Sequence, residues 1–108
     1  MRKYLFHGTY TPEGYKGLMA EGGSARIDAA KRALGSVGGS LEAFYWAFGD
    51  TDFYVIADVP DTATAAALGL TVSGAGAVRT SMTVLLTAEE IDQAKGKTID
   101  YKVPGASS

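Results

Sequence analysis

Two apolar segments separated by a short polar turn lie in the middle of the chain and constrain its fold most strongly. The first covers residues 41–48 and includes the consecutive aromatic residues Phe44, Tyr45 and Trp46, and the second covers residues 53–59. Residues 49–52 between them read Gly-Asp-Thr-Asp, a composition typical of a tight turn. Apolar runs joined in this way indicate a β-hairpin. We therefore predict two adjacent antiparallel strands here.

The segments that flank this hairpin each combine a strand with a helix. Residues 4–10 and 78–86 are rich in aromatic and β-branched residues and predict two further strands. A turn or short helix is expected over residues 11–21. The main helices are expected from the N-cap Ser24 to Gly38-Gly39, and from Asp61 or Thr62 to the glycines at 74–76. The capping-box pattern at residues 87–90 predicts a short last helix.

The resulting order is β-α-β-β-α-β with a C-terminal helix. This order predicts an α+β, ferredoxin-like domain over residues 1–95, built on a four-stranded antiparallel sheet, and a tail over residues 96–108. Helical spacing assigns these side chains to packing faces: Ile27, Ala30, Leu34 and Val37 in the first long helix, and Ala63, Ala66, Ala67 and Leu70 in the second. Ile91 is expected to anchor the last helix, and Tyr101 and Val103 are possible packing points in the tail.

The central strands carry apolar side chains on both faces. Strict alternation would place Leu41, Ala43 and Tyr45 opposite Phe44 and Trp46, so neither side of the strand is polar. In the next strand the apolar residues Tyr54 and Ile56 lie on one face, and Phe53, Val55, Ala57 and Val59 lie on the other. Helices can cover only one face of such a sheet, and a second copy of the chain is the simplest cover for the other. We therefore expect a homodimer, or a higher oligomer, whose sheets form a dimeric α+β barrel.

Composition excludes several classes of function. The chain has no cysteine and one histidine, so thiolate or multi-histidine metal sites and cysteine catalysis are ruled out, and we expect no metal and no cofactor. The net charge is −2, and residues 41–78 contain no Lys or Arg beside the aromatic block, which argues against nucleic-acid binding. No signal-like or membrane-spanning apolar run is present, so a cytoplasmic location without membrane partners is expected.

Several spaced motifs between Lys3 and Glu90 resemble the GYD-domain family. They are Thr11-Pro12-Glu13-Gly14, Glu21-Gly22-Gly23-Ser24-Ala25-Arg26, Gly38-Gly39, Glu42-Ala43-Phe44-Tyr45, Phe48-Gly49-Asp50-Thr51-Asp52, Asp58-Val59-Pro60-Asp61, Gly76-Ala77-Val78-Arg79-Thr80 and Leu85-Leu86-Thr87. The resemblance implies a dimeric α+β barrel, a group that includes cofactor-free enzymes and non-enzymatic subunits, and it implies no particular reaction. The tyrosine of the family's Gly-Tyr-Asp turn has no counterpart in residues 49–52, whereas Asp52 matches the turn aspartate.

Two residues are candidates for acid–base chemistry. His7, the single histidine, could act as a general base, or it could simply make one hydrogen bond on a sheet face. Asp52 shares its turn with Asp50, and paired carboxylates can serve as an acid and a base, although aspartate is also a common structural residue of turns.

Four residues are candidates for ligand binding. Arg26 begins the first long helix and could hold an anionic group or pair with a carboxylate, for which Asp52 is the first choice, and Arg79 has the same two interpretations. Tyr45 and Trp46 could line an apolar pocket or pack in the core.

Two functions remain open on the sequence alone. In one, the protein is a small-molecule-binding protein or a cofactor-free enzyme, with a pocket beneath residues 24–37. In the other, it is a non-catalytic interaction or regulatory subunit.

Overall fold

Four antiparallel strands form a single sheet in the order β2-β3-β1-β4. The structure is a computed structural model that describes residues 1–105. The elements are β1 (Arg2–Tyr10), α1 (Pro12–Glu21), α2 (Gly23–Gly35), β2 (Ser40–Trp46), β3 (Phe53–Val59), α3 (Thr62–Gly74), β4 (Val78–Leu85) and α4 (Ala88–Lys95). The predicted α+β, ferredoxin-like arrangement is confirmed, with α1 as a complete helix of its own.

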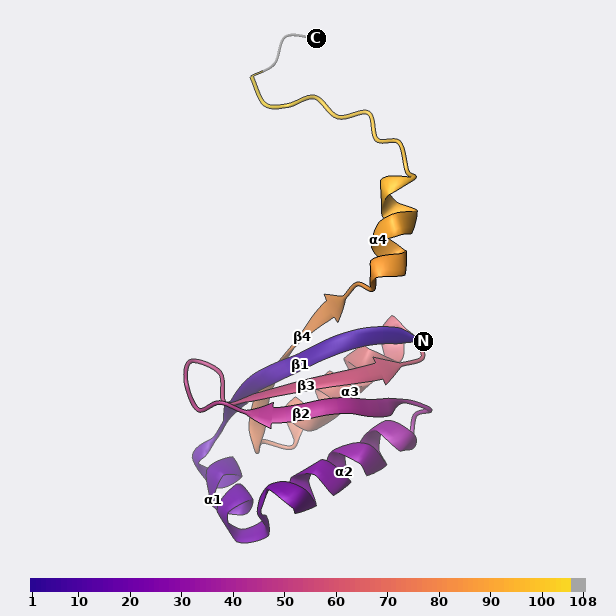
Figure 1. Ribbon diagram of the computed structural model, residues 1–108. Coiled ribbons are helices and arrows are strands. Elements are labelled where there is room, and N and C mark those ends of the chain that lie inside the picture. Colours follow the sequence, from indigo (N-terminus) through magenta and orange to yellow (C-terminus); the bar gives the residue numbers. More distant parts are fainter. Residues whose placement is uncertain (106–108) are drawn as a thin grey trace.

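One face of the sheet is covered by helices and holds the core (Figure 1). Alternate residues of β1 and β3 point to this side, where Leu34 of α2 and Ala65 of α3 pack against them. The buried apolar residues are Tyr4, Phe6, Leu34, Phe53, Val55, Ala57, Val59 and Ala65. Burial of this set supplies the main driving force for folding.

A bulge in β2 changes which of its residues face the helices. The register shifts between Leu41 and Ala43, so that Leu41 lies opposite Ala57 and packs on the core beside Phe44 and Trp46. The prediction that Leu41 shares a face with Ala43 and Tyr45 is therefore wrong. An extra residue in one strand reverses the alternation on one side of it, and no residue type in the sequence marks this bulge.

The boundary between α1 and α2 also differs from expectation. Gly22, at φ +85°, ends α1 and at the same time serves as the N-cap of α2, so Ser24 lies inside the first turn and is not the cap. Glycine adopts this backbone conformation without the strain that a side chain would bring. At the other end, α2 stops at Gly35, earlier than the predicted Gly38-Gly39.

The face of α3 that packs on the sheet is opposite to the predicted one. Ala65 is fully buried and Leu68 packs against the core, whereas Ala63, Ala66 and Leu70 are exposed. The helix is apolar on all sides, so hydrophobic spacing could not distinguish its faces. Its N-cap is Asp61, whose carboxylate accepts a hydrogen bond from the N–H of Thr64 at 2.8 Å. Of the two predicted caps, Asp61 and Thr62, the first is therefore confirmed.

The last part of the chain extends away from the sheet. The predicted capping box of α4 is present, with Thr87 and Glu90 bonded reciprocally. Beyond β4, however, residues 86–105, here called the C-terminal arm, lead away from the body of the domain (Figure 1). Ile91, the expected anchor of α4, is 51% exposed, and Tyr101 and Val103 are also exposed. The radius of gyration is 17.6 Å, against about 13 Å for a compact domain of this length.

None of the helices in residues 1–105 is both long enough and apolar enough to cross a bilayer.

Candidate functional site

A pocket of about 420 Å³ lies between the sheet and the helices α1, α2 and α3. Its floor includes Phe6, Phe53 and Val55 from the central strands, and its walls include Ala30 of α2 and Leu68 of α3. The size is within the range of about 300–1,000 Å³ that is usual for small-ligand sites. The position agrees with the expectation of a cavity beneath residues 24–37.

The pocket exists because the helices above the sheet present small side chains to it. Three alanines of α2, Ala29, Ala30 and Ala33, line it, together with Gly17 of α1 and Gly69 of α3. Side chains of this size cannot fill the space between a helix and a sheet, so the aromatic residues beneath them remain accessible. The sequence shows these small residues, but it does not show that they line one pocket, because that depends on how three separate helices pack.

Charged groups lie along the rim of the pocket. Arg26 is part of the lining, and its guanidinium lies 3.6 Å from the carboxylate of Glu21, which lines the pocket as well. Glu13 adds a second carboxylate. The rim therefore has two negative groups and one positive group. The expected contact between Arg26 and Asp52 is wrong, because each of these residues has a different partner.

Asp52 is the buried polar residue of the described chain, at 4% exposure. Its carboxylate accepts a hydrogen bond from the backbone N–H of Tyr10 at 2.9 Å and one from the hydroxyl of Tyr15 at 2.5 Å. Its own N–H donates to the carbonyl of Gly8 at 2.8 Å. Asp52 thus joins the hairpin turn to the end of β1 and to α1. The hydrogen bond to this carboxylate, reinforced by burial, raises the pKa of Tyr15 above its ordinary value.

Tyr10 connects this buried group to the pocket. Its side chain lines the pocket, its ring is 5.5 Å from that of Tyr15, and its hydroxyl accepts a hydrogen bond from the indole N–H of Trp46 at 2.9 Å. Trp46 stacks on Phe44 at 4.3 Å. A tyrosine at the end of a strand carries no distinctive pattern, so the sequence does not single out Tyr10.

The other predicted residues lie on the opposite, open face of the sheet. The imidazole Nε2 of His7 is 3.3 Å from the hydroxyl of Thr83, and its ring lies alongside Tyr54. Tyr45 is 70% exposed on β2, and Arg79 is exposed on β4. The six predicted residues are therefore divided: Arg26 lines the pocket, Trp46 and Asp52 lie behind it, and His7, Tyr45 and Arg79 are across the sheet.

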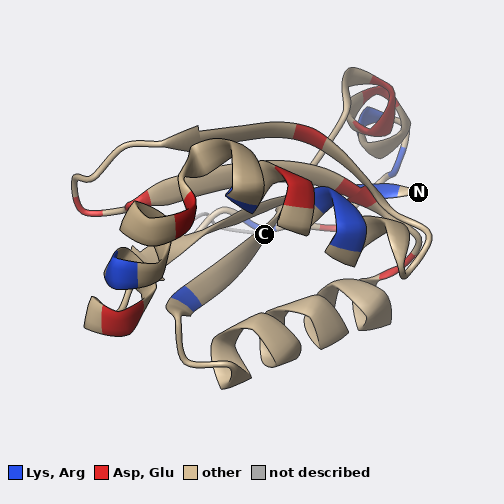
Figure 2. Ribbon diagram, turned by 90° about the horizontal axis from the view of Figure 1, so that it is seen from below, with Lys and Arg blue, Asp and Glu red and all other residues tan. Residues whose placement is uncertain are grey.

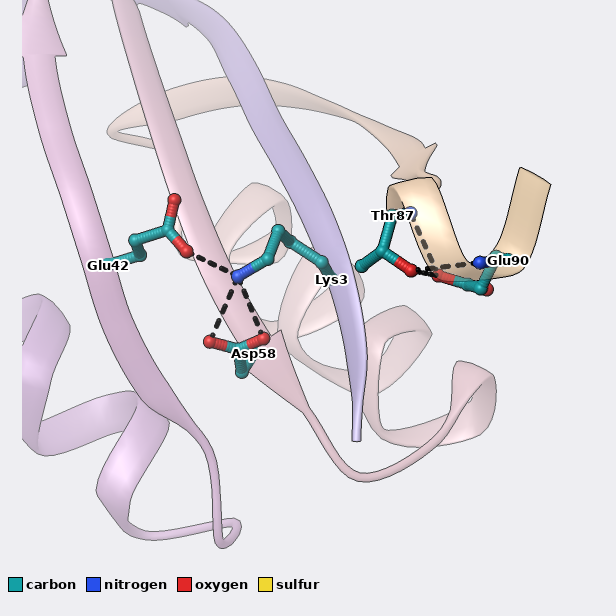
Figure 3. Close-up of polar contacts among 5 residues, drawn as sticks. All are labelled: Lys3, Glu42, Asp58, Thr87 and Glu90. Carbon is teal, nitrogen blue, oxygen red and sulfur yellow. Dashed lines mark hydrogen bonds and ion pairs between the residues drawn. The ribbon is translucent and has the colours of Figure 1, made fainter. Parts of the chain in front are cut away.

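A cluster of three charged residues on the open face was not foreseen. The ammonium of Lys3 lies between the carboxylates of Glu42 and Asp58, and it bonds to both (Figure 3). These hydrogen bonds raise the pKa of Lys3. The partners are 39 and 55 residues away from Lys3 in the sequence, so only the register of β1, β2 and β3 brings them together.

Charged residues are distributed unevenly over the helices. Figure 2 shows acidic and basic positions along α1 and α2, whereas α3 contains none. Within residues 1–105, no three His, Cys, Asp or Glu side chains are grouped closely enough to hold a metal ion.

The fold and the pocket define a ferredoxin-like α+β domain with an apolar cavity under its helices. The model of the GYD domain matches residues 4–94, most of the chain, and the protein belongs to this family. The sequence matches no curated protein and no solved structure.

Proposed function

We propose that this GYD-domain protein is a homodimer that binds a small apolar molecule in the pocket between its sheet and helices α1, α2 and α3. The observation that carries this proposal is the pocket itself, which combines a volume of about 420 Å³ with an apolar floor and a few charged groups at the rim. Burial of apolar ligand surface contributes about 25 cal/mol per Å². Such a site favours a ligand whose surface is largely hydrocarbon.

Binding fits the lining better than catalysis does. Among the described residues that line the pocket, none is Ser, Cys, His or Lys. Asp52 is behind the pocket with its carboxylate held by two donors, and His7 is on the other side of the sheet. A cofactor-free reaction here would have to use the hydroxyl of Tyr10, Thr71 or Thr80, or the charged groups of the rim.

The test is titration with Nile red, an uncharged dye whose fluorescence rises in apolar surroundings. Ala30→Phe places a ring in the pocket, whereas Ala25→Phe places the same ring on an exposed position of the same helix outside the lining. We expect saturable binding to the wild type, at least about tenfold weaker binding to Ala30→Phe, and unchanged binding to Ala25→Phe. Equal affinity for both variants, or no binding to the wild type, would refute a ligand site in this pocket.

Dimerisation through the open face of the sheet is the second part of the proposal. Leu5 and Ile56 lie on this face, and Lys3 is paired there with two carboxylates of its own chain, which leaves one net negative charge. Four strands of seven to nine residues give a flat area of about 500 Å², against about 800 Å² per partner in a stable interface. The exposed apolar side chains of the C-terminal arm supply the additional contact surface, packed on the second copy.

A second candidate function, a non-catalytic interaction subunit, is favoured by α3. This helix carries no charged residue, its Leu70 is 76% exposed, and it contacts β4, whose outer edge is unpaired in the sheet. Such an edge pairs readily with the same strand of a second copy. In that case light scattering should show an oligomer larger than a dimer, and Leu70→Glu should lower its mass. Nile red should then not bind in the pocket.

A further inference from the structure

The hydroxyl of Tyr10 is a hydrogen-bond donor of the pocket lining that is fixed in place and still has its proton available. In residues 1–105, the hydroxyl of Tyr10 makes a single hydrogen bond, the one that it accepts from Trp46 at 2.9 Å. A tyrosine hydroxyl can accept and donate at once, so its proton remains free for a further acceptor. The donor atom of Trp46 cannot accept a hydrogen bond, so the direction of this contact is certain.

The position of this hydroxyl is determined by packing as well. The ring of Tyr10 lies 5.4 Å from that of Phe53 in an edge-to-face arrangement and 5.5 Å from that of Tyr15. Its backbone N–H is bonded to the buried carboxylate of Asp52. Trp46, in turn, is held by stacking on Phe44. A polar group restrained on several sides in this way loses little entropy when a ligand binds to it.

The remaining polar groups of the lining indicate the charge of the ligand. Glu13 and Glu21 place two carboxylates at the rim, and Arg26 is already paired with Glu21. The hydroxyl of Thr80 points to backbone carbonyls, and the hydroxyl of Thr71, on an exposed residue of the lining, adds no charge. The rim is thus negative on balance, and an anionic ligand would have to overcome repulsion within an apolar cavity.

We propose that the ligand is an uncharged, largely apolar molecule with one hydrogen-bond acceptor, such as a ketone or an ester carbonyl, and that the hydroxyl of Tyr10 donates to this acceptor. This inference rests on the proposed function of the pocket. Tyr10 is then the residue that selects among apolar molecules of similar shape, because the pocket walls discriminate only by size.

Three small aromatic probes of nearly equal shape test this inference. Acetophenone has a carbonyl, α-methylstyrene replaces that oxygen with a CH₂ group, and benzoate carries a negative charge. Dissociation constants come from titrations followed by backbone amide chemical shifts. A hydrogen bond contributes about 0.5–1.5 kcal/mol net. We therefore expect acetophenone to bind about 2–10-fold more tightly than α-methylstyrene, and benzoate to bind more weakly than acetophenone.

Tyr10→Phe should abolish the preference for acetophenone while binding of α-methylstyrene is retained. The matched control is Tyr101→Phe in the exposed arm, which should keep the preference. Equal binding of acetophenone and α-methylstyrene to the wild type, a preference that survives in Tyr10→Phe, or tightest binding of benzoate would overturn the inference and leave the apolar site in place. If neither uncharged probe shifts the amides around the pocket, the proposed function itself fails. The comparison of probes on the wild type needs no variant, so it decides the matter even if Tyr10→Phe does not fold.

Discussion

Asp52 shows how a single side chain can hold three distant segments together. Its carboxylate and its backbone N–H link the hairpin turn to β1 and to α1. The sequence indicated this residue as either a turn residue or an acid–base group, and the structure shows contacts of the first kind. Its partners could not be foreseen, since Tyr10 and Tyr15 precede it by 42 and 37 residues. Sequence patterns report local spacing, whereas these contacts depend on the complete fold.

Asp52→Ala should lower the free energy of unfolding by about 1–3 kcal/mol, because the N–H of Tyr10 loses its acceptor in a partly buried position. The control is Asp50→Ala in the same turn, where the side chain is exposed and the expected change is below about 0.5 kcal/mol. Urea denaturation of both variants measures the difference. Equal destabilisation by the two substitutions would mean that the contacts of Asp52 contribute nothing beyond turn propensity.

At the level of elements, the sequence predicted strands and caps better than helix faces. The hairpin, the helix beginning after Asp61 and the capping box of α4 were all predicted, because each depends on residues close together in the chain. The sheet-facing side of α3 was predicted wrongly, because alanine and leucine occur all around this helix. The pocket depends mainly on small residues of α2, beneath which the sequence predicted a cavity, but most of its other lining residues were not predicted.

Leucine substitutions in α3 test which side of the helix packs on the sheet. Ala65→Leu should destabilise the protein by about 1–3 kcal/mol, because Ala65 is fully buried in the core cluster and a larger side chain there must displace its neighbours. Ala66→Leu, one residue further along on an exposed position, should have little effect. Thermal unfolding monitored by circular dichroism distinguishes them. The reverse order would support the face expected from the sequence and contradict the packing seen in the structure.

The cap of α3 should make this helix sensitive to acid. The backbone N–H of Thr64 bonds to Asp61 and lowers the pKa of its carboxyl below the usual value. The folded pKa is the lower one, so the contribution of this cap to stability is present above the unfolded pKa of about 3.9. This contribution is lost as the pH falls through the pKa that Asp61 has in the folded protein.

The stability deficit of Asp61→Ala relative to the wild type should therefore be larger at neutral pH than at a pH below the folded pKa. Urea denaturation at both pH values measures it. A deficit that does not shrink in acid would show that the charge of Asp61 has no part in capping.

On the scale of the whole molecule, the isolated chain leaves apolar side chains uncovered in two places. Leu5 and Ile56 lie beside the charged cluster of Lys3 on the open face of the sheet, and the C-terminal arm carries exposed apolar residues. The sequence indicated the first from the strands with two apolar faces. It did not indicate the second, since Ile91, Tyr101 and Val103 were expected to pack within their own chain and are exposed. We propose that a second copy of the chain covers both of these surfaces.

Light scattering after size exclusion should give about twice the chain mass of 11.2 kDa at micromolar concentration. Ile56→Glu places a charge on the open face and should shift the protein towards the monomer, and Ile91→Glu should weaken the dimer through the arm. Lys31→Glu, on the exposed side of α2, serves as the control and should leave the mass unchanged. A wild-type protein that remains a monomer would contradict the proposed dimer.

The most direct measurement of where the ligand binds is the set of intermolecular nuclear Overhauser effects between bound acetophenone and the methyl groups of the protein. We expect contacts to Ala30, Leu34 and Val78, which line the pocket beneath the helices. Leu5 and Ile56, on the open face of the sheet, should show none. Contacts confined to Leu5 and Ile56, with none to the pocket, would contradict the account and place the ligand on the other side of the sheet.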